Sequence, residues 1–229
     1  IGDYIVIDKI GSGGMGAVYK GVSRKNRSRV VALKVLNDEY SLSENQRRRF
    51  VNEGTIIDSL DHPHIVKIYQ RENQNNNLYI AMEYLEGRTL RERLSSEGIL
   101  DLAEAGAMMS QLVDVIAAIH DKGVIHRDLK PENIMLVQRE GHANFVKILD
   151  FGLAIMKNAT RLTRSGMFMG TVGYTPPEQV SGNGYNFPGD IYSLGVIFYE
   201  MVTGEQPFFG ETSLEIIKQI LNEEPVEPV

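Results

Sequence analysis

His126-Arg127-Asp128-Leu129-Lys130-Pro131-Glu132-Asn133 is the most informative stretch of the sequence. It gathers a potential base, two cations and an amide within eight residues. Pro131 and the density of charge argue against a helix interior or a central strand, so the stretch predicts a rigid loop. A loop that holds Asp128 and Asn133 five residues apart can direct both side chains into one cleft. The alternative is a solvated, charged turn.

These residue types suit phosphoryl transfer. In that reaction a carboxylate orients the incoming hydroxyl, and an amide oxygen helps to hold Mg²⁺. Asp128 and Asn133 could take these two parts. The eight residues alone favour a catalytic site over a charged turn, and the flanking sequence has to support that interpretation.

Composition excludes several other classes of protein. The 229 residues suffice for one large domain or two lobes, and 42% hydrophobic with 24% charged residues is ordinary for a globular protein. A formal net charge of −6 provides no general basic surface for nucleic acid. The absence of cysteine excludes disulfides and thiolate metal sites. No unbroken apolar run approaches the roughly eighteen residues of a membrane span, so we expect no membrane contact by this segment.

Both ends of the sequence suggest truncation. The chain starts at Ile1 with no signal peptide, and it stops at Val229 just after a helical pattern. We therefore expect a piece of a longer protein.

The first third predicts a β-rich region with a glycine loop. Strands are expected over Tyr4–Ile10 and Val30–Leu36. Between them, glycines would let backbone amides approach phosphate oxygens. A dinucleotide-binding turn is disfavoured, because there the last glycine should open a helix. A plain structural hairpin stays open. The expected phosphate loop and its apolar neighbour comprise Gly11, Ser12, Gly13, Gly14, Met15, Gly16 and Val18.

A lysine in the next strand has a potential acidic partner. Lys34 follows Ala32 in an apolar strand, where it either faces solvent or grips phosphates as a point charge. A helix is predicted over Ser43–Leu60, with Glu53 in its middle. A solvated face is the default for such a glutamate, and its pairing with Lys34 depends on the other motifs.

The sequence then changes from strand to helix. Strands are predicted over Ile65–Arg71 and Leu78–Tyr84, and helical periodicity dominates from Thr89. Asp101 is a candidate cap for a long helix. We place the boundary so that residues 1–86 form one lobe and 87–229 the other. Further helices are expected from Asp190 to about Gly204 and over Ser213–Leu221, and His62 and His64 are interpreted as turn residues.

Six motifs along the chain resemble, in type and order, those of the eukaryotic-type protein kinase family. The resemblance is strongest to its bacterial serine/threonine members. The resemblance covers essentially the whole chain. It rests on the glycine loop, Lys34 in Val31-Ala32-Leu33-Lys34, Glu53, the Asp128–Asn133 loop, Asp150-Phe151-Gly152 and Pro176-Pro177-Glu178.

The resemblance implies an α+β, bilobal protein-kinase-like fold that binds ATP with Mg²⁺ (Mn²⁺ is a second candidate). It implies catalytic roles for Lys34, Glu53, Asp128 and Lys130, and metal binding by Asn133 and Asp150. The C-terminal lobe would be incomplete, because the family's last helices are missing. The purine would lie against Val18, Ala32 and Met135, near Met82 and the connecting residues Glu83, Tyr84 and Leu85. For these apolar residues, core packing is the alternative.

Lys130 and the Gly170-Thr171 pair imply Ser/Thr acceptors in protein substrates. Leu153–Thr175 would be the activation loop, with Thr160, Thr163 and Ser165 as candidate phosphorylation sites and Arg127 as their partner. Ile155 departs from the family, which often has a basic residue there. Arg161 or Arg164 could compensate.

A pseudokinase scaffold is the main rival, and a small-molecule kinase is a lesser one. Pseudokinases usually lack the strand lysine, the catalytic aspartate or the aspartate of Asp150-Phe151-Gly152, all of which are present. The expected location is the cytoplasm, with a membrane anchor open for the full protein. A dimer that phosphorylates itself is a further expectation.

Overall fold

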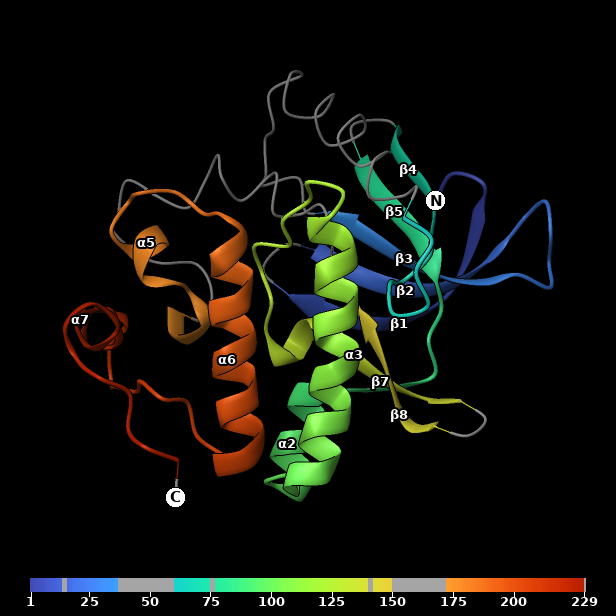
Figure 1. Ribbon diagram of the computed structural model, residues 1–229. Coiled ribbons are helices and arrows are strands. Elements are labelled where there is room, and N and C mark those ends of the chain that lie inside the picture. Colours follow the sequence, from blue (N-terminus) through green and yellow to red (C-terminus); the bar gives the residue numbers. More distant parts are fainter. Residues whose placement is uncertain (14–15, 37–59, 75–76, 140–141, 150–171, 229) are drawn as a thin grey trace. The chain divides into compact units, whose positions relative to one another are not determined.

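The computed structural model describes residues 1–13, 16–36, 60–74, 77–139, 142–149 and 172–228. The chain divides into two compact units, Ile1–Glu86 and Gly87–Val229. Figure 1 labels their helices and strands. In the described ranges the first unit is a β-sheet and the second is mainly helical, so each is built around its own secondary structure.

Five antiparallel strands form the sheet of the first unit, in the order β1-β2-β3-β5-β4. The predicted strand Val30–Leu36 is confirmed, and the prediction Leu78–Tyr84 is confirmed to within one residue at each end. The strands are β1 (Tyr4–Gly13), β2 (Gly16–Ser23), β3 (Val30–Leu36), β4 (Ile68–Gln74) and β5 (Asn77–Glu83).

The prediction for β4 was wrong at both ends, because it began and ended too early. Ile65 and Val66 are buried, at 4% and 2% exposure, but they lie before the strand begins at Ile68. At its other end the strand continues to Gln74, which pairs with Asn77 of β5. Burial alone therefore does not mark a strand, and pairing with the neighbouring strand sets the bounds.

One face of the central strands forms the core of this unit. Val31 and Leu33 of β3 are fully buried, while Ala32 and Lys34 lie on the opposite face because side chains alternate along a strand. Burying each large apolar side chain contributes about 1.5–3 kcal/mol. The buried cluster comprises Tyr4, Val31, Leu33, Tyr79 and Ala81.

The second unit combines a small sheet with helices. The sheet has the order β6-β7-β8, with β6 (Gly87–Thr89), β7 (Ile134–Arg139) and β8 (His142–Ile148). The helices are α2 (Leu90–Glu97), α3 (Leu102–His120), α5 (Pro177–Val180), α6 (Phe187–Thr203) and α7 (Ser213–Asn222), with short 3₁₀ turns η1 (Pro131–Asn133) and η2 (Val172–Tyr174).

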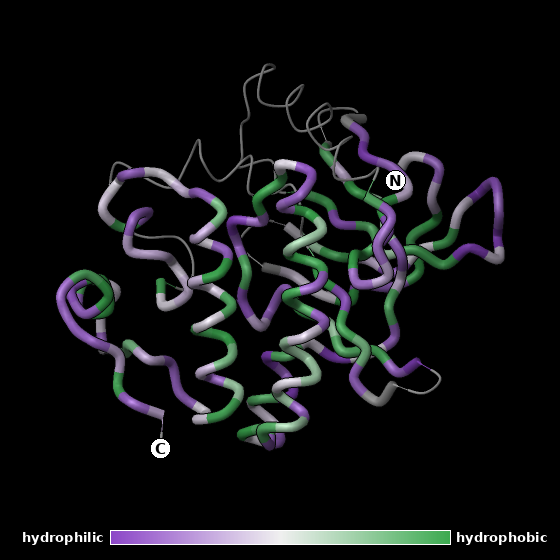
Figure 2. The backbone as a smooth tube through the Cα atoms, viewed as in Figure 1, coloured by the Kyte–Doolittle hydropathy of each residue, from purple (hydrophilic) through white to green (hydrophobic). Residues whose placement is uncertain are grey.

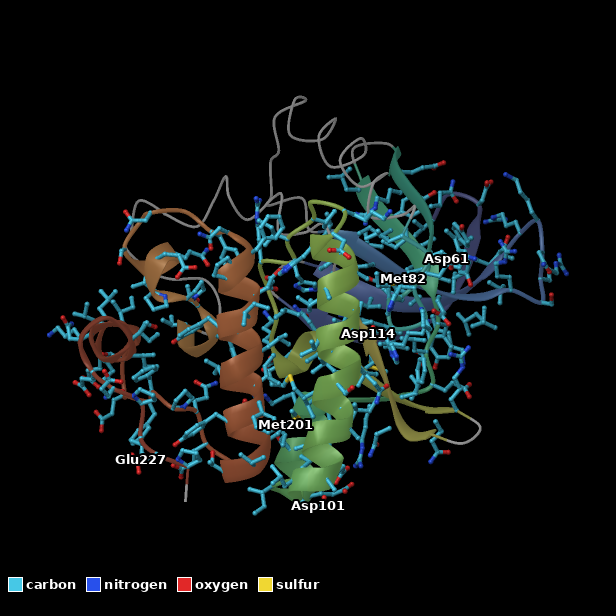
Figure 3. The ribbon with its side chains drawn as sticks, in the orientation of Figure 1. Asp61, Met82, Asp101, Asp114, Met201 and Glu227 are labelled. Carbon is cyan, nitrogen blue, oxygen red and sulfur yellow. The ribbon has the colours of Figure 1, made fainter. Side chains whose placement is uncertain are left out.

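Helices α3 and α6 lie side by side and form the centre of this unit (Figure 1). Asp101 caps α3 by accepting a hydrogen bond from the Glu104 amide at 2.8 Å, as predicted. Met201, labelled on α6 in Figure 3, is fully buried, and its carbonyl accepts a bond from the Leu100 amide at 2.8 Å. The two helices are thus joined by packing, and a backbone hydrogen bond ties α6 to the segment just before α3.

Contrary to the expectation from sequence, α3 is long and apolar enough to cross a membrane by length and composition. It packs against both α6 and β8. Its buried positions recur at helical spacing: Ala105, Met108, Leu112, Val115, Ile116 and Ile119. This is the pattern of a core helix.

The prediction that helices dominate after Thr89 missed the β7–β8 hairpin. It also started α6 three residues late, since the helix begins at Phe187, before Asp190. The end of α6 at left-handed Gly204 is confirmed, and α7 runs one residue beyond the predicted Ser213–Leu221. In Figure 2 green and purple alternate around α7, in line with an amphipathic helix.

Candidate active site

The structure brings together three of the predicted site residues, Asp128, Lys130 and Asn133, in one loop. Asn133 Nδ2 donates to the Asp128 carbonyl at 2.7 Å and to Asp128 Oδ2 at 3.0 Å. Lys130 Nζ lies 3.3 Å from the same Oδ2. The two amide hydrogens of Asn133 thus point to Asp128, so its Oδ1 is the atom left to bind a cation.

The backbone of this loop is held by a buried carboxylate on α6. Asp190 has no exposed surface. Its oxygens accept bonds from the amides of His126 and Arg127 at 2.8 and 2.9 Å, and from the Tyr185 hydroxyl at 2.9 Å. His120 Nε2 lies 2.8 Å from Asp190 Oδ2. These partners replace the water that a buried carboxylate loses.

Arg127 has an unusual backbone conformation. Its φ of +67° is the only positive φ of a non-glycine residue in the described part of the chain. Such a conformation costs about 1–3 kcal/mol and persists only where the surroundings enforce it. The bond from its amide to Asp190 provides that enforcement. Among the described residues, the buried Arg127 Nε has no hydrogen-bond partner.

The loop also holds the end of β8. The Leu149 amide donates to the Asn133 carbonyl at 2.8 Å, and His126 Nε2 lies 3.1 Å from the Leu149 carbonyl. Leu149 directly precedes Asp150 in the sequence. The chain is therefore fixed to the Asp128 loop one residue before the second predicted metal ligand.

The glycine loop of the first unit closes the β1–β2 hairpin, with Gly13 opposite Gly16. Gly16 has a φ of +150°, and a Cβ there would lie 1.9 Å from the Val35 carbonyl oxygen. At Gly11 a Cβ would meet only Val18 Cβ, at 4.0 Å. The close approach of β3 thus explains glycine at position 16, and no contact within the described residues explains it at position 11. Ser12 is exposed at the end of β1.

Four predicted nucleotide contacts share one face of the sheet. Val18 lies opposite Lys34, and Ala32 lies opposite Met82. Residues directly opposite in an antiparallel pair project to the same side. Ala32 and Met82 are 8% and 7% exposed. This face carries a small apolar surface beside Lys34, and Lys20, which lies opposite Ala32, projects to the same side.

Glu83, Tyr84 and Leu85 lie at the end of β5 and just beyond it. The Glu83 amide donates to the Lys67 carbonyl at 2.8 Å. Lys20 Nζ lies 4.3 Å above the Tyr84 ring, a cation–π contact. Met135, the other predicted purine contact, lies on β7 in the second unit, and its role stays a prediction.

Several predicted functional residues lie outside the described residues: Gly14, Met15, Glu53, Asp150, Thr160, Thr163, Ser165 and Thr171. The described residues contain no group of three or more His, Asp or Glu side chains that could hold a metal. His62 and His64 lie with their ring centroids 5.6 Å apart.

One residue of the site was missed from sequence. Arg91 on α2 contacts Glu132 of the Asp128 loop, Tyr174 of η2 and Glu200 of α6. Its partners are 41, 83 and 109 positions away in the sequence, so no local pattern relates them. The sequence feature that could have pointed to Arg91 is a cation in the first turn of a helix, where the helix dipole disfavours positive charge.

The chain matches the family described as "Protein kinase domain" over residues 4–227. It belongs to that family, and the predicted α+β protein-kinase fold is confirmed. Protein kinases use ATP and a divalent cation, so the family also supports the coarse prediction of these two ligands.

The curated relatives are bacterial serine/threonine kinases, which confirms that part of the resemblance. Serine/threonine-protein kinase PrkC of Bacillus subtilis is 38% identical over 225 residues, or 98% of this chain and 34% of that protein. A probable serine/threonine-protein kinase of Clostridium perfringens is 37% identical over 225 residues, or 98% and 32%. PknL of Mycobacterium tuberculosis is 37% identical over 219 residues, or 96% and 54%. The chain thus spans about a third of the length of the first two.

Proposed function

We propose that this chain is the catalytic domain of a serine/threonine protein kinase, which transfers the γ-phosphoryl group of ATP to Ser or Thr hydroxyls of protein substrates. The observation that carries the proposal is the loop in which Asp128, Lys130 and Asn133 meet while Asp190 holds its backbone. A merely solvated turn would not need a fully buried carboxylate beneath it.

Asp128 accepts a hydrogen bond from the incoming hydroxyl and thereby orients its oxygen. Lys130 Nζ, 3.3 Å from Asp128 Oδ2, supplies positive charge where the transferred group is most negative. Because these groups are fixed in advance, they stabilise the transition state without reorganising during the reaction.

Asn133 and Asp150 would hold Mg²⁺, which neutralises charge between the β and γ phosphates when it is bound. Asn133 Oδ1 fits this role, because both hydrogens of the amide are used by Asp128. The two contacts of Leu149 support the assignment of its neighbour Asp150.

In the first unit, the nucleotide would lie against the face that carries Val18, Ala32, Lys34 and Met82. Lys34 would grip the phosphates with Glu53 as its acidic partner. Gly11 supports a phosphate loop over a plain hairpin, because no neighbour among the described residues requires a glycine there. Ser12, Gly13, Gly14, Met15 and Gly16 would complete that loop. Glu83, Tyr84 and Leu85 would bind the purine edge through their backbone, and Met135 is the proposed purine contact from the second unit.

Regulation by phosphorylation of the activation loop is part of the proposal. The buried Arg127 Nε, which has no partner among the described residues, would bind a phosphate on Thr160, Thr163 or Ser165. Mass spectrometry after incubation with ATP tests this. Phosphate on one of these residues supports the idea, and its absence from all three removes it.

The test of the function is incubation with ATP, Mg²⁺ and a generic Ser/Thr substrate, followed by phosphoamino-acid analysis. Asp128→Asn should lower turnover by at least about 100-fold, the usual contribution of a positioned base, and leave the protein folded. Wild-type turnover by a folded Asp128→Asn variant would contradict the role of Asp128. No turnover by the wild type would favour the pseudokinase.

A cytoplasmic location, a membrane anchor elsewhere in the full protein and a dimer that phosphorylates itself belong to the proposal as expectations for the whole protein. The similarity to PrkC supports the same class of reaction, and substrates have to be found by experiment.

A further inference from the structure

Arg91 connects four elements of the second unit. Its Nε donates to Glu132 Oε1 at 3.0 Å, in η1 of the Asp128 loop. Its Nη1 donates to Glu200 Oε1 at 2.7 Å, on α6, and its Nη2 donates to the Tyr174 hydroxyl in η2. The Tyr174 hydroxyl also donates to Glu200. One side chain on α2 thus binds the loop, the turn and the helix at once.

The position of Arg91 on its own helix disfavours a positive charge. Thr89 caps α2 and forms a capping box with Glu92, so Arg91 lies in the first turn. Backbone dipoles there repel a cation. Burial works against the charge as well, but the hydrogen bonds to Glu200 and the nearby negative groups raise the pKa of Arg91 above its usual value. The carboxylates therefore account for an arginine at this position.

The contacts of Arg91 reach both the Asp128 loop, which holds the proposed base, and the Val172–Tyr174 turn on the acceptor side. Glu132 directly precedes Asn133, whose amide binds Asp128. Tyr174 lies three residues after Thr171 in the segment expected beside the acceptor hydroxyl. The Tyr174 carbonyl accepts a bond from the Ser193 hydroxyl at 2.9 Å, which ties the turn to α6 a second time.

We propose that Arg91 is a positioning residue, which fixes the Asp128 loop relative to the Val172–Tyr174 turn through Glu132, Glu200 and Tyr174. The proposal rests on the proposed kinase function. Arg91 touches neither nucleotide nor acceptor; it keeps the base and the acceptor-side turn in register. Misplacement by about 1 Å can lower a rate by about 100-fold, so the loss of such a residue should appear in turnover.

The same helix supplies a control. Arg93 is 8% exposed and pairs with Glu97 at 3.1 Å and Glu104 at 3.3 Å, on α2 and α3. Like the half-buried Arg91 it is ion-paired, but none of its partners among the described residues belongs to the Asp128 loop or to η2. A purely structural role of Arg91 would make the two arginines equivalent.

The experiment compares R91A, R91K, R93A and E132A by steady-state kinetics and thermal unfolding, at a temperature where each variant is folded. R91A should lower kcat by about 10- to 100-fold with little change in the KM for ATP. R91K should recover only part of the loss, because an ammonium cannot bind both carboxylates in the arginine's geometry. R93A should lower the unfolding temperature and keep the wild-type kcat.

The E132A variant tests the positioning role even if R91A does not fold. Its side chain is 38% exposed, so E132A removes the link to the loop without leaving Glu200 unpaired. We expect kcat to fall while the unfolding temperature changes little. Added guanidinium should raise the kcat of R91A and not that of R93A.

The outcomes separate this inference from the proposed function. An active wild type with equal kcat in R91A and R93A, or with unchanged kcat in E132A, would overturn the positioning role and leave the kinase assignment intact. An inactive wild type would overturn the proposed function itself.

Discussion

Gly11 and Gly16 belong to one hairpin, but different constraints require glycine at each. At Gly16 the Val35 carbonyl occupies the place of a Cβ and the φ is +150°. At Gly11 the nearest atom to a Cβ within the described part of the chain is Val18 Cβ, at 4.0 Å. We therefore expect the two positions to respond differently to the same substitution.

Gly11→Ala should keep or raise the free energy of unfolding, by about 0.4–1 kcal/mol, because alanine restricts the unfolded chain. It should raise the KM for ATP about two- to tenfold, the equivalent of one weakened hydrogen bond. Gly16→Ala should cost about 1–3 kcal/mol of stability through overpacking. Urea unfolding and ATP titration measure both. Equal losses of stability in the two variants would contradict the assignment of Gly11 to a ligand.

Tyr192 provides a prediction for alkaline pH. Burial, and then the charge of Glu178, raise the pKa of Tyr192 to about 12 from 10.0. The unfolded chain loses the phenolic proton near pH 10 and the folded chain only near pH 12, so this contribution to stability is full below pH 10 and lost as the pH rises to 12. Tyr192→Phe should weaken the loss of stability over this range.

At neutral pH the same variant should be neutral or stabilising. The buried Tyr192 hydroxyl has no hydrogen-bond partner in the described ranges, and removing an unsatisfied buried hydroxyl removes a desolvation cost. Chemical denaturation at pH 7, 10 and 11.5 tests both statements. A destabilised variant at pH 7, with the wild-type pH dependence, would refute this account of Tyr192.

Among the elements, helices α3 and α6 carry glycines with opposite requirements. Gly106 lies inside α3, and no atom of the described residues comes within 4 Å of a Cβ built there. Gly204 ends α6 in the left-handed region at φ +81°, and its Cβ would lie 3.0 Å from Ile99 Cγ2. Glycine is a cost in a helix interior and an advantage at this type of helix end.

Gly106→Ala should raise the free energy of unfolding by about 0.5–1 kcal/mol, the difference in helix propensity. Gly204→Ala should lower it by about 1–2 kcal/mol, the cost of a left-handed alanine. The two changes add the same methyl group to neighbouring helices, so each is the control of the other. Changes of the same sign in thermal or urea unfolding would be inconsistent with a helix-interior Gly106 and a helix-terminal Gly204.

Elements defined by local signals could be predicted from the sequence. Asp101 marks the start of α3 by capping, and Gly204 marks the end of α6 by its conformation. The β7–β8 hairpin could not be placed in the same way. Its apolar run Ile134–Val137 follows directly on the Asp128 loop in the sequence, and Gly141 precedes the second apolar run. Its bounds depend on pairing across the turn.

The candidate site was predictable to a similar extent. The loop from His126 to Asn133 could be found because its residues are adjacent in the sequence. Arg91 could not, because its function in the fold depends on partners up to 109 positions away. Asp190 lies between these cases. The sequence predicted it as the start of a helix, but its bonds to the His126 and Arg127 amides required the structure.

For the whole molecule, binding of nucleotide should be visible as stability. A ligand at 100 times its Kd adds about 2.7 kcal/mol to the free energy of unfolding. ATP with Mg²⁺ should therefore raise the unfolding temperature by several degrees, and a chelator should reduce the shift and stop phosphoryl transfer. Asn133→Ala, which removes the proposed metal ligand, should bind ATP with a weaker dependence on Mg²⁺. An identical shift with and without the chelator would argue against a metal-bound nucleotide.

Helix α6 sets a fixed spacing within this fold. Asp190 and Glu200 lie ten residues apart on it, about 15 Å along the axis, and each carboxylate anchors a different part of the site. Inserting a single residue between them would rotate one carboxylate by about 100° relative to the other. The number of residues between Asp190 and Glu200 is therefore as constrained as the residue types. Insertions should be tolerated in the surrounding loops and not in this part of the helix.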